Sequence, residues 1–447
     1  MDSIVKQHGS AQQKILDSIL NPVRQMLTDG WILQYCRSIG HVWRCRRFCP
    51  VVSLLTCIWK QLGQFSARDV EDYVALLART CDDTSRDGRD FCNARARLPL
   101  PLFQRAQELT GAMASNSAPR RYKHLRVALL DGTTLRTAAT TANRKAFGSS
   151  TNQHGSSHSP VLRLALLLCA GCGAVLDLAF GPYTVSEARL FTLLISRLPS
   201  AMLVVGDTTA CSFTIFAMAL QRGSHLLCPL CPGRKRQVLR RLSRNDTLEL
   251  WPRSTPAHVI YPQFLRELPA AIEVRVIERS IRRRGYRDYK VTLVTTLLDA
   301  KEFPANDLVQ QYLQRWDIEL DIRTLKHQHG LEILSGLTPQ VACREMYAAI
   351  LAYNCVRALM AQASATPRRL SHHRSIEILL HISTQMVCSA TIRLPELFAA
   401  LLHFIRTARS PQQDRPPEPR AILHRKHAFP YLTMSRKAWR DRYYAAS

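Results

Sequence analysis

The spacing of hydrophobic positions divides the chain into stretches with different periods. In the first part, apolar side chains recur at helical spacing in the segments 31–36, 51–62 and 70–80. The polar segment 110–124 is rich in small residues, which is typical of a linker. The sequence therefore predicts a helical N-terminal domain over residues 1–115.

The middle of the chain has the patterns of alternating strands and helices. Short apolar runs predict strands at 126–132, 161–170, 173–183, 202–207 and 224–230. Helical spacing predicts two helices, at 185–198 and 213–223, with Ser186 placed to cap the first. The order strand, two hairpin strands, helix, strand, helix, strand is that of a ribonuclease-H-like sheet. The predicted fold class is therefore α/β.

The last third of the chain changes pattern twice. Residues 231–298 form short alternating, strongly basic runs, which indicate a mainly β insertion with a DNA contact at 233–244 and 281–290. Helical spacing then returns at 338–364 and 394–408, ahead of a basic tail rich in proline. We therefore expect a core domain at 125–360, interrupted by the β insertion, and a basic helical C-terminal region at 361–447.

One segment between the insertion and these helices carries four polar residues at fixed spacing. Tyr312, Arg315, Glu319 and Lys326 follow the pattern Y-x2-R-x3-E-x6-K. On a continuous helix, as predicted here, their side chains would fall within an arc of roughly 60°. A carboxylate, two cations and a phenol on one face suit a metal ion and a phosphate. The alternative is an ordinary solvated helix face with favourable charge pairs.

The charge of the chain narrows the choice of partner. Its 447 residues include 61 Lys and Arg but 34 Asp and Glu, a formal net charge of +27. Such an excess favours a nucleic acid, because phosphate contacts release counterions. The N-terminal segment lacks a secretory pattern, and the apolar run 161–174 is too short to span a bilayer. We therefore expect a cytoplasmic protein that does not enter a membrane.

Two aspartates give the polar helix face a chemical context. Asp131 and Asp207 each lie at or just beyond the end of an apolar run. A charge at such a position costs free energy to desolvate unless it reaches solvent or binds a cation. A single aspartate there is commonly a turn cap. Together with Glu319, however, the two could hold a pair of divalent ions roughly 3.5–4 Å apart. Oxygen ligands favour magnesium or manganese over zinc.

The two strand-associated aspartates, the Y-x2-R-x3-E-x6-K segment and the segment GPYTVSEARLFTLL resemble DDE transposases of the insertion-sequence-four family. The resemblance extends over about residues 128–360. It implies a ribonuclease-H-like catalytic core in which Asp131, Asp207 and Glu319 are the catalytic residues and bind two Mg²⁺ (or Mn²⁺) ions. The segment after Asp207 reads Thr-Thr-Ala-Cys-Ser-Phe, where many relatives have Arg or Ala, then Gly and Phe.

The resemblance also implies contacts with DNA. Tyr312, Arg315 and Lys326 would bind phosphates of the transposon end, and an aromatic residue would hold a flipped base. We assign that aromatic role to Trp251 in the insertion, with a core tryptophan as the alternative. The N-terminal domain would also bind DNA.

The implied protein is the transposase of a bacterial insertion sequence, acting as a homodimer on double-stranded DNA. Its substrates would be the terminal inverted repeats and target DNA, cut and joined at one site, and the protein would be nucleoid-associated when bound. Two alternatives stay open. One is a metal-dependent nuclease of the same fold that does not join strands, and the other is a catalytically inactive DNA-binding derivative.

Overall fold

The computed structural model describes residues 20–44, 47–78, 87–149, 151–152, 155–156, 158–233, 236–254, 264, 268–281, 289–389, 391–410 and 434–445. The chain divides into two compact units. The first comprises Met1–Arg279 and Thr292–Pro411, and the second Ser280–Val291 and Gln412–Ser447. The second unit contains helix α17 (Arg436–Ala445). All site residues discussed below belong to the first unit.

A large mixed sheet has the strand order β6-β5-β2-β7-β8-β12-β11-β10-β9. Its strands are β2 (Leu125–Thr137), β5 (Val161–Cys169), β6 (Val175–Pro182), β7 (Met202–Val205), β8 (His225–Pro229), β9 (Gln237–Ser243), β10 (Asp246–Pro252), β11 (Ala271–Ile281) and β12 (Tyr289–Thr295). Strand β2 pairs antiparallel with β5 and parallel with β7, and β7 is parallel to β8. The short strands β1 (Arg121–Tyr122) and β13 (Ile333–Leu334) also pair with β2, and β3 (Thr151–Asn152) pairs with β4 (Gly155–Ser156). The predicted strands are thus confirmed.

Two helices cover one side of the central strands. Helix α9 (Glu187–Ser196) precedes β7, and helix α10 (Phe213–Gln221) precedes β8. Their buried side chains, including Phe191 and Phe216, share a hydrophobic core with Val204 of β7. Burial of each phenylalanine stabilises the fold by about 1.5–3 kcal/mol. Ser186 caps α9, as predicted, because its Oγ accepts a hydrogen bond from the Arg189 N–H at 3.3 Å.

Helix α7 (Leu100–Ser117) occupies most of the segment for which a linker was predicted. The prediction was wrong because the small residues there serve close packing instead of flexibility. A Cβ at Gly111 would lie 2.3 Å from the Val175 carbonyl oxygen, so only glycine allows this approach to β6. Gln107, one turn earlier, donates a hydrogen bond of 2.9 Å to the same oxygen.

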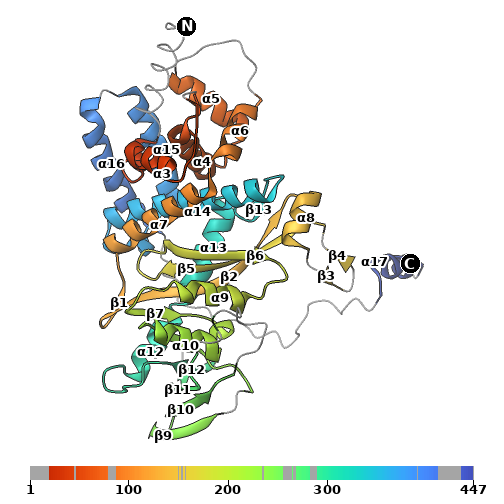
Figure 1. Cartoon of the computed structure of the whole chain (residues 1–447), viewed down its shortest axis with the longest axis vertical. Coiled ribbons are helices and arrows are strands. Elements are labelled where there is room, and N and C mark those ends of the chain that lie inside the picture. Colours follow the sequence, from red (N-terminus) through yellow and green to blue (C-terminus); the bar gives the residue numbers. More distant parts are fainter. Residues whose placement is uncertain are drawn as a thin grey trace. The chain divides into compact units, whose positions relative to one another are not determined.

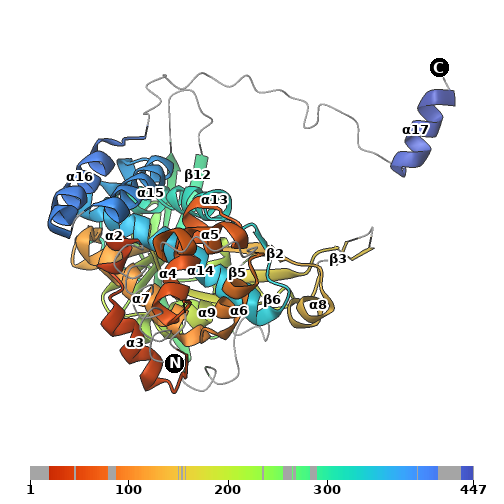
Figure 2. The same ribbon diagram turned by 90° about the horizontal axis from the view of Figure 1, so that it is seen from above.

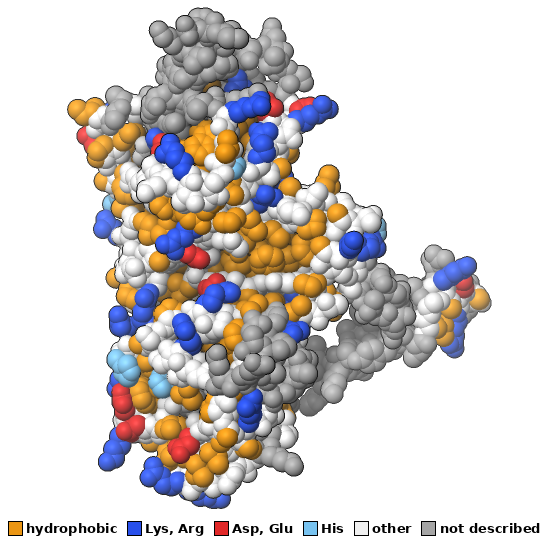
Figure 3. All heavy atoms as spheres, viewed as in Figure 1, with side chains coloured by type: hydrophobic (Ala, Val, Ile, Leu, Met, Phe, Trp, Pro, Cys, Tyr) orange, Lys and Arg blue, Asp and Glu red, His pale blue; other side chains and the backbone are white. Residues whose placement is uncertain are grey.

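The remaining helices gather on the same part of the first unit as α7. They are α2 (Asn21–Arg24), α3 (Asp29–Ser38), α4 (Pro50–Gly63), α5 (Ala67–Ala78), α6 (Arg89–Arg97), α14 (Pro339–Ala363), α15 (His372–Cys388) and α16 (Leu394–Thr407), while α8 (Thr141–Phe147) follows β2. Helix α14 packs along α7 and α4, and α15 and α16 pack against it (Figures 1 and 2). N-terminal and C-terminal helices thus share one layer above the sheet. In Figure 3, hydrophobic side chains form a band across the middle of the visible face.

The signature segment forms two helices, not the single helix predicted. Helix α12 (Ala305–Leu313) carries Tyr312, whereas α13 (Trp316–Gln328) carries Glu319 and Lys326. Between them the backbone tightens to bonds between residues three apart, such as Arg315 N–H to the Tyr312 carbonyl at 2.9 Å. The four residues therefore do not share one continuous helix face.

The predicted β insertion consists of the antiparallel strands β9, β10 and β11, together with β12, at one end of the sheet. Most of the basic run 281–290 lies outside the described residues. Among the helices that the structure describes, none is long and apolar enough to cross a membrane.

Candidate active site

Asp131 lies in the middle of β2, not at the end of a strand as expected. Its register partner is Leu166 of β5, and β2 continues for six residues beyond it. The sequence misplaced the strand end because Gly132, Thr133 and Thr134 are polar or small, although they continue the ladder. The Asp131 side chain retains 17% of its exposure, and its Oδ1 accepts a hydrogen bond of 2.8 Å from the Gly132 N–H.

Asp207 comes just after β7, as the sequence predicted. The register between β2 and β7 sets Leu129 opposite Val205, so each aspartate lies two residues further along a pair of parallel strands. Asp207 caps the 3₁₀ turn Thr208–Ala210, accepting hydrogen bonds from the Thr209 N–H at 2.9 Å and the Thr209 hydroxyl at 3.1 Å. Asp207 therefore caps a turn and also lies level with Asp131 on the neighbouring strand.

Arg315 brings the third carboxylate to the two aspartates. Its guanidinium Nη2 lies 3.1 Å from Glu319 Oε1, and its Nη1 lies 3.7 Å from Asp131 Oδ2. The Arg315 side chain is largely buried, while that of Glu319 keeps 45% of its exposure. The arginine thus forms the helix charge pair that was the alternative interpretation of the signature, and bridges it to the sheet.

The carboxylates are close enough to affect one another. Burial raises the pKa of Asp131, and the negative charges of Asp207 and Glu319 raise it further. The Gly132 N–H and the Arg315 guanidinium oppose this rise. The structure therefore gathers all three predicted carboxylates in one region, with an excess of negative charge.

A fourth carboxylate, Glu187, lies at the same place and was not assigned to the site from the sequence. Burial raises its pKa to about 7, with further contributions from the charges of Asp207 and Asp131. Arg163 of β5 and the Gly132 N–H partly offset this. Glu187 is therefore a carboxyl group that changes protonation near neutral pH beside the two aspartates.

Close packing against Gly132 explains the position of Glu187. A Cβ at residue 132 would lie 2.2 Å from Glu187 Oε1, so a side chain there would displace the carboxylate. In the sequence, Glu187 follows the helix cap Ser186, where a carboxylate is expected simply to favour the helix N-terminus. Two features of the sequence could have pointed to Glu187: the glycine that follows Asp131, and an acidic residue inside the segment 181–194.

The carboxylates of the site suit a divalent metal ion, although they do not converge on a single point in this structure. Carboxylate oxygens in excess over nearby cations are the ligands that magnesium and manganese prefer. Within the described ranges, no group of three or more His, Cys, Asp or Glu side chains is close enough to hold an ion as it stands. The Glu319 carboxylate faces Arg315 instead.

The predicted DNA contacts occupy different environments. Tyr312 is buried and hydrogen-bonds Arg315, whereas Lys326 is half-buried, its pKa lowered by burial. Trp251 is fully buried and packs against Phe216 with ring centroids 5.3 Å apart. The assignment of Trp251 to a flipped base was therefore wrong, because core packing hides its ring.

An exposed aromatic side chain lies beside the site on α13. Trp316 keeps 56% of its exposure, and the Arg315 guanidinium carbon lies 4.8 Å from its ring centroid. Leu320, one turn later, is equally exposed. The local sequence around the two tryptophans does not reveal that Trp316 is exposed and Trp251 is buried.

Comparisons with known proteins show which family the chain is similar to. The model of the family described as Transposase DDE domain matches residues 122–355. The chain is 25% identical over 434 residues to the Transposase InsG for insertion sequence element IS4 of Escherichia coli (strain K12), covering 93% of this chain and 95% of InsG. It also resembles a piggyBac transposase in a synaptic complex with hairpin DNA, with a TM-score of 0.42, 10% identity, and 87% and 85% of the two chains covered.

The family match includes every carboxylate described above and both helices of the signature segment. It spans more than half of the chain, and the relationship to InsG continues into the helices on either side. The chain therefore belongs to the family of transposases with a DDE domain, and it is an enzyme that acts on DNA.

Proposed function

We propose that this transposase cleaves the ends of its own insertion sequence and joins them to target DNA, in a cut-and-paste reaction at a single site. The observation that carries the proposal is the convergence of Asp131, Asp207 and Glu319 from two strands and a helix in a DDE transposase. The net charge of +27 supports a DNA substrate.

We also infer a ribonuclease-H-like core. The strand order β6-β5-β2-β7-β8, with α9 and α10 as crossovers between parallel strands, supports it. The proposed organisation is a helical DNA-binding domain at 1–115, the catalytic core at 125–360 with its β insertion at 231–298, and a basic helical region at 361–447.

In this proposal Asp131, Asp207 and Glu319 would hold two divalent ions, Mg²⁺ or Mn²⁺. Such ions, when bound, make water more acidic and stabilise the oxygens of a phosphodiester under attack. The protein supplies the rest. The ladder from β2 to β5 and β7 fixes Asp131, and the hydrogen bonds from Thr209 orient Asp207. Burial and the charges of Asp207 and Asp131 raise the pKa of Glu187 to about 7, so this carboxyl group would bind and release a proton beside Asp131 near neutral pH.

Arg315 has a distinct part in the proposal. Its single positive charge partly offsets the negative charges of Asp131 and Glu319 in the protein without metal, and this reduces the repulsion between the carboxylates. Release of Glu319 from Arg315 would free the carboxylate for the ions and the guanidinium for a DNA phosphate. Tyr312 would then act through Arg315, because its side chain is buried and its hydroxyl oxygen accepts a hydrogen bond from the Arg315 guanidinium.

We further propose that Lys326 and Trp316 contact the DNA next to the reacting bond. Lys326 is half-buried and would bind a phosphate through its ammonium group, and the exposed side chain of Trp316 offers a stacking surface. Two protomers would hold the two inverted repeats, since one catalytic site acts on one end. The working location would be the nucleoid of a bacterial cytoplasm.

The test is cleavage of a duplex carrying one terminus of the element that encodes the chain. Glu319→Gln should keep duplex binding and lose Mg²⁺-dependent cleavage, because it removes a charge without changing shape. Full nicking by this variant would defeat the assignment of the carboxylates.

Strand transfer separates the alternatives. With precleaved ends, a transposase joins them to a plasmid, whereas a nuclease of this fold does not. An inactive DNA-binding derivative would bind the ends and show no magnesium-dependent chemistry.

A further inference from the structure

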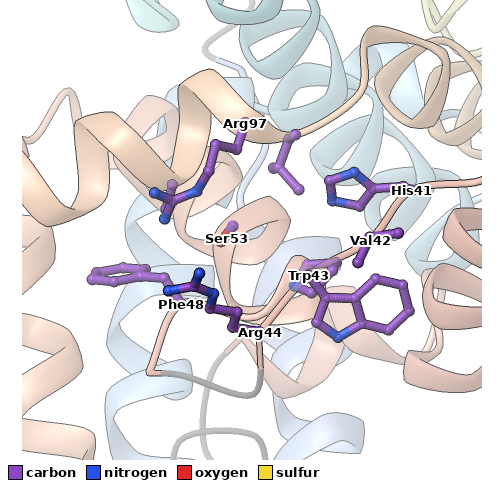
Figure 4. A pocket seen from close by; sticks show the side chains of 10 residues that line it. His41, Val42, Trp43, Arg44, Phe48, Ser53 and Arg97 are labelled. Carbon is purple, nitrogen blue, oxygen red and sulfur yellow. The ribbon is translucent and has the colours of Figure 1, made fainter.

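A separate cavity of about 360 Å³ lies in the helical part of the first unit. It opens between the segment before α4 and the C-terminal end of α6, and its lining includes His41, Trp43, Arg44, Phe48 and Arg97 (Figure 4). Its volume lies in the range of small-ligand sites, roughly 300–1,000 Å³. None of its lining residues belongs to the carboxylate site.

The cavity has positive charges without negative partners. Arg44 and Arg97 are exposed, and neither forms an ion pair within the part of the chain that the structure describes. Figure 4 shows both guanidinium groups on the side of the cavity where Phe48 lies. Among the described residues that line the cavity there is no Asp or Glu. An anion entering it would therefore meet two cations and none of the described carboxylates.

Helix α6, which carries Arg97, adds to this positive charge. Arg95, on the same helix as Arg97, is buried at 8% exposure and has no ion pair among the described residues. Burial lowers the pKa of Arg344, and the neighbouring charge of Arg95 lowers it as well. A protonated arginine raises the local potential at short range, because the protein screens charge less than water does.

Aromatic side chains supply the other half of the lining. Trp43 is partly exposed, stacks on His41 with centroids 5.9 Å apart, and lies under Arg37 at 5.8 Å. Phe48 is held by Phe91, with centroids 6.2 Å apart. Planar rings next to arginines are the combination by which proteins bind unpaired nucleotides, through stacking and phosphate contacts.

We propose that this cavity binds one nucleotide of a DNA strand outside the double helix. Arg44 and Arg97 would contact its backbone phosphates, and Trp43 and Phe48 would pack on its base or sugar. The cavity is too small for a base pair, so the nucleotide enters unstacked. This inference rests on the proposed function for its ligand class, since DNA is the substrate of a transposase.

The test measures binding of the full chain, without metal ions, to two labelled duplexes. One is blunt, and the other carries an unpaired tail of roughly six nucleotides, a usual length for a single-strand site. Wild type should prefer the tailed duplex. Arg44→Gln with Arg97→Gln should lose that preference, and its salt slope should fall by about 1.4, since each single-strand phosphate contact contributes roughly 0.7. Trp43→Leu should weaken tailed-duplex binding about tenfold through lost stacking.

The matched control is Arg105→Gln with Arg374→Gln. It removes the same charge from two exposed arginines that each pair with a glutamate three residues on, away from the cavity. An equal loss in both double variants, or equal wild-type affinity for the two duplexes, would overturn the proposal. An acidic protein segment as the true occupant would give this second result. Cleavage of transposon ends by wild type tests the proposed function separately, because the binding assay contains no metal.

Discussion

The acidic residues on the two faces of helix α13 have opposite surroundings. On one face Glu319 is half exposed and shares Arg315 with Asp131, close to Asp207. On the other face Asp321, two residues later, is 2% exposed and faces two arginines. The first region has more negative charge than its cation balances. In the second, Arg368 also lies 4.0 Å from Asp317, so two carboxylates face two arginines, and the side chains of Asp321 and Arg357 are buried.

The buried region holds α13 in place. Asp321 Oδ1 accepts hydrogen bonds from Arg357 at 2.6 Å and from the Tyr353 hydroxyl at 3.1 Å, and its Oδ2 lies 2.9 Å from Arg368 Nη2. A Cβ at Gly173, whose φ is +79°, would lie 2.9 Å from Asp321 Oδ1, so glycine is required in that turn between β5 and β6. A buried network of opposite charges thus fixes one face of the helix, and the carboxylate cluster on the other face keeps an excess of negative charge that suits it to bind cations.

Breaking the buried network should give the largest effect on stability. Asp321→Ala leaves Arg357 buried without its carboxylate, which should lower the free energy of unfolding by about 3–5 kcal/mol. Urea unfolding of the purified protein measures this loss, with Glu319→Ala as the control two residues away. A loss for Glu319→Ala as large as that for Asp321→Ala would remove the distinction between the two faces.

Removing the cation of the open region should cost less. Arg315→Gln leaves Asp131 and Glu319 without their guanidinium and should lower stability by about 1–2 kcal/mol at pH 8. The raised pKa of Asp131 means that its native carboxyl takes up a proton more readily than in the unfolded chain. The loss should therefore shrink as the pH falls into the range where Asp131 binds a proton, because protonation removes the repulsion. A pH-independent loss would show that Arg315 acts through packing alone.

Glu187 should show its effect in the pH dependence of stability. Its pKa is raised from 4.5 to about 7, so its contribution is fully present below pH 4.5 and is lost as the pH rises through 7. Glu187→Gln should therefore be more stable than wild type at pH 8, by on the order of 1 kcal/mol after allowance for solvent screening. Thermal melts from pH 4 to 8 measure this. A variant less stable than wild type at pH 8 would assign Glu187 a purely structural role.

Lys326 should give the smallest change in stability, within about 0.5 kcal/mol, because no ion pair holds it among the described residues. Lys326→Ala should still lower the salt dependence of binding to transposon ends by about one unit of slope. Fluorescence anisotropy at a series of salt concentrations measures this, with Lys301→Ala as a control in the loop before α12. An unchanged slope would exclude Lys326 from the phosphate contacts.

Much of the core could be predicted from local patterns, because alternation and helical spacing report burial directly. The strands and the helices α9 and α10 follow from such patterns, and Ser186 and Gly223 mark helix ends. The linker prediction at 110–124 was wrong because its local pattern does not report burial. Small residues near Gly111 are ambiguous in sequence, since they suit a flexible segment and a close helix contact equally well.

By itself, the sequence singled out Asp131, Asp207 and Glu319 as candidates, through the apolar runs before the two aspartates and the Y-x2-R-x3-E-x6-K spacing. Only the tertiary structure decided their surroundings. It added Glu187 through the space above Gly132, turned Arg315 toward the carboxylates, and buried Trp251 while exposing Trp316. The physical reason is that pairing and burial depend on elements far apart in the chain, whereas a local pattern records only which side of its own element is apolar.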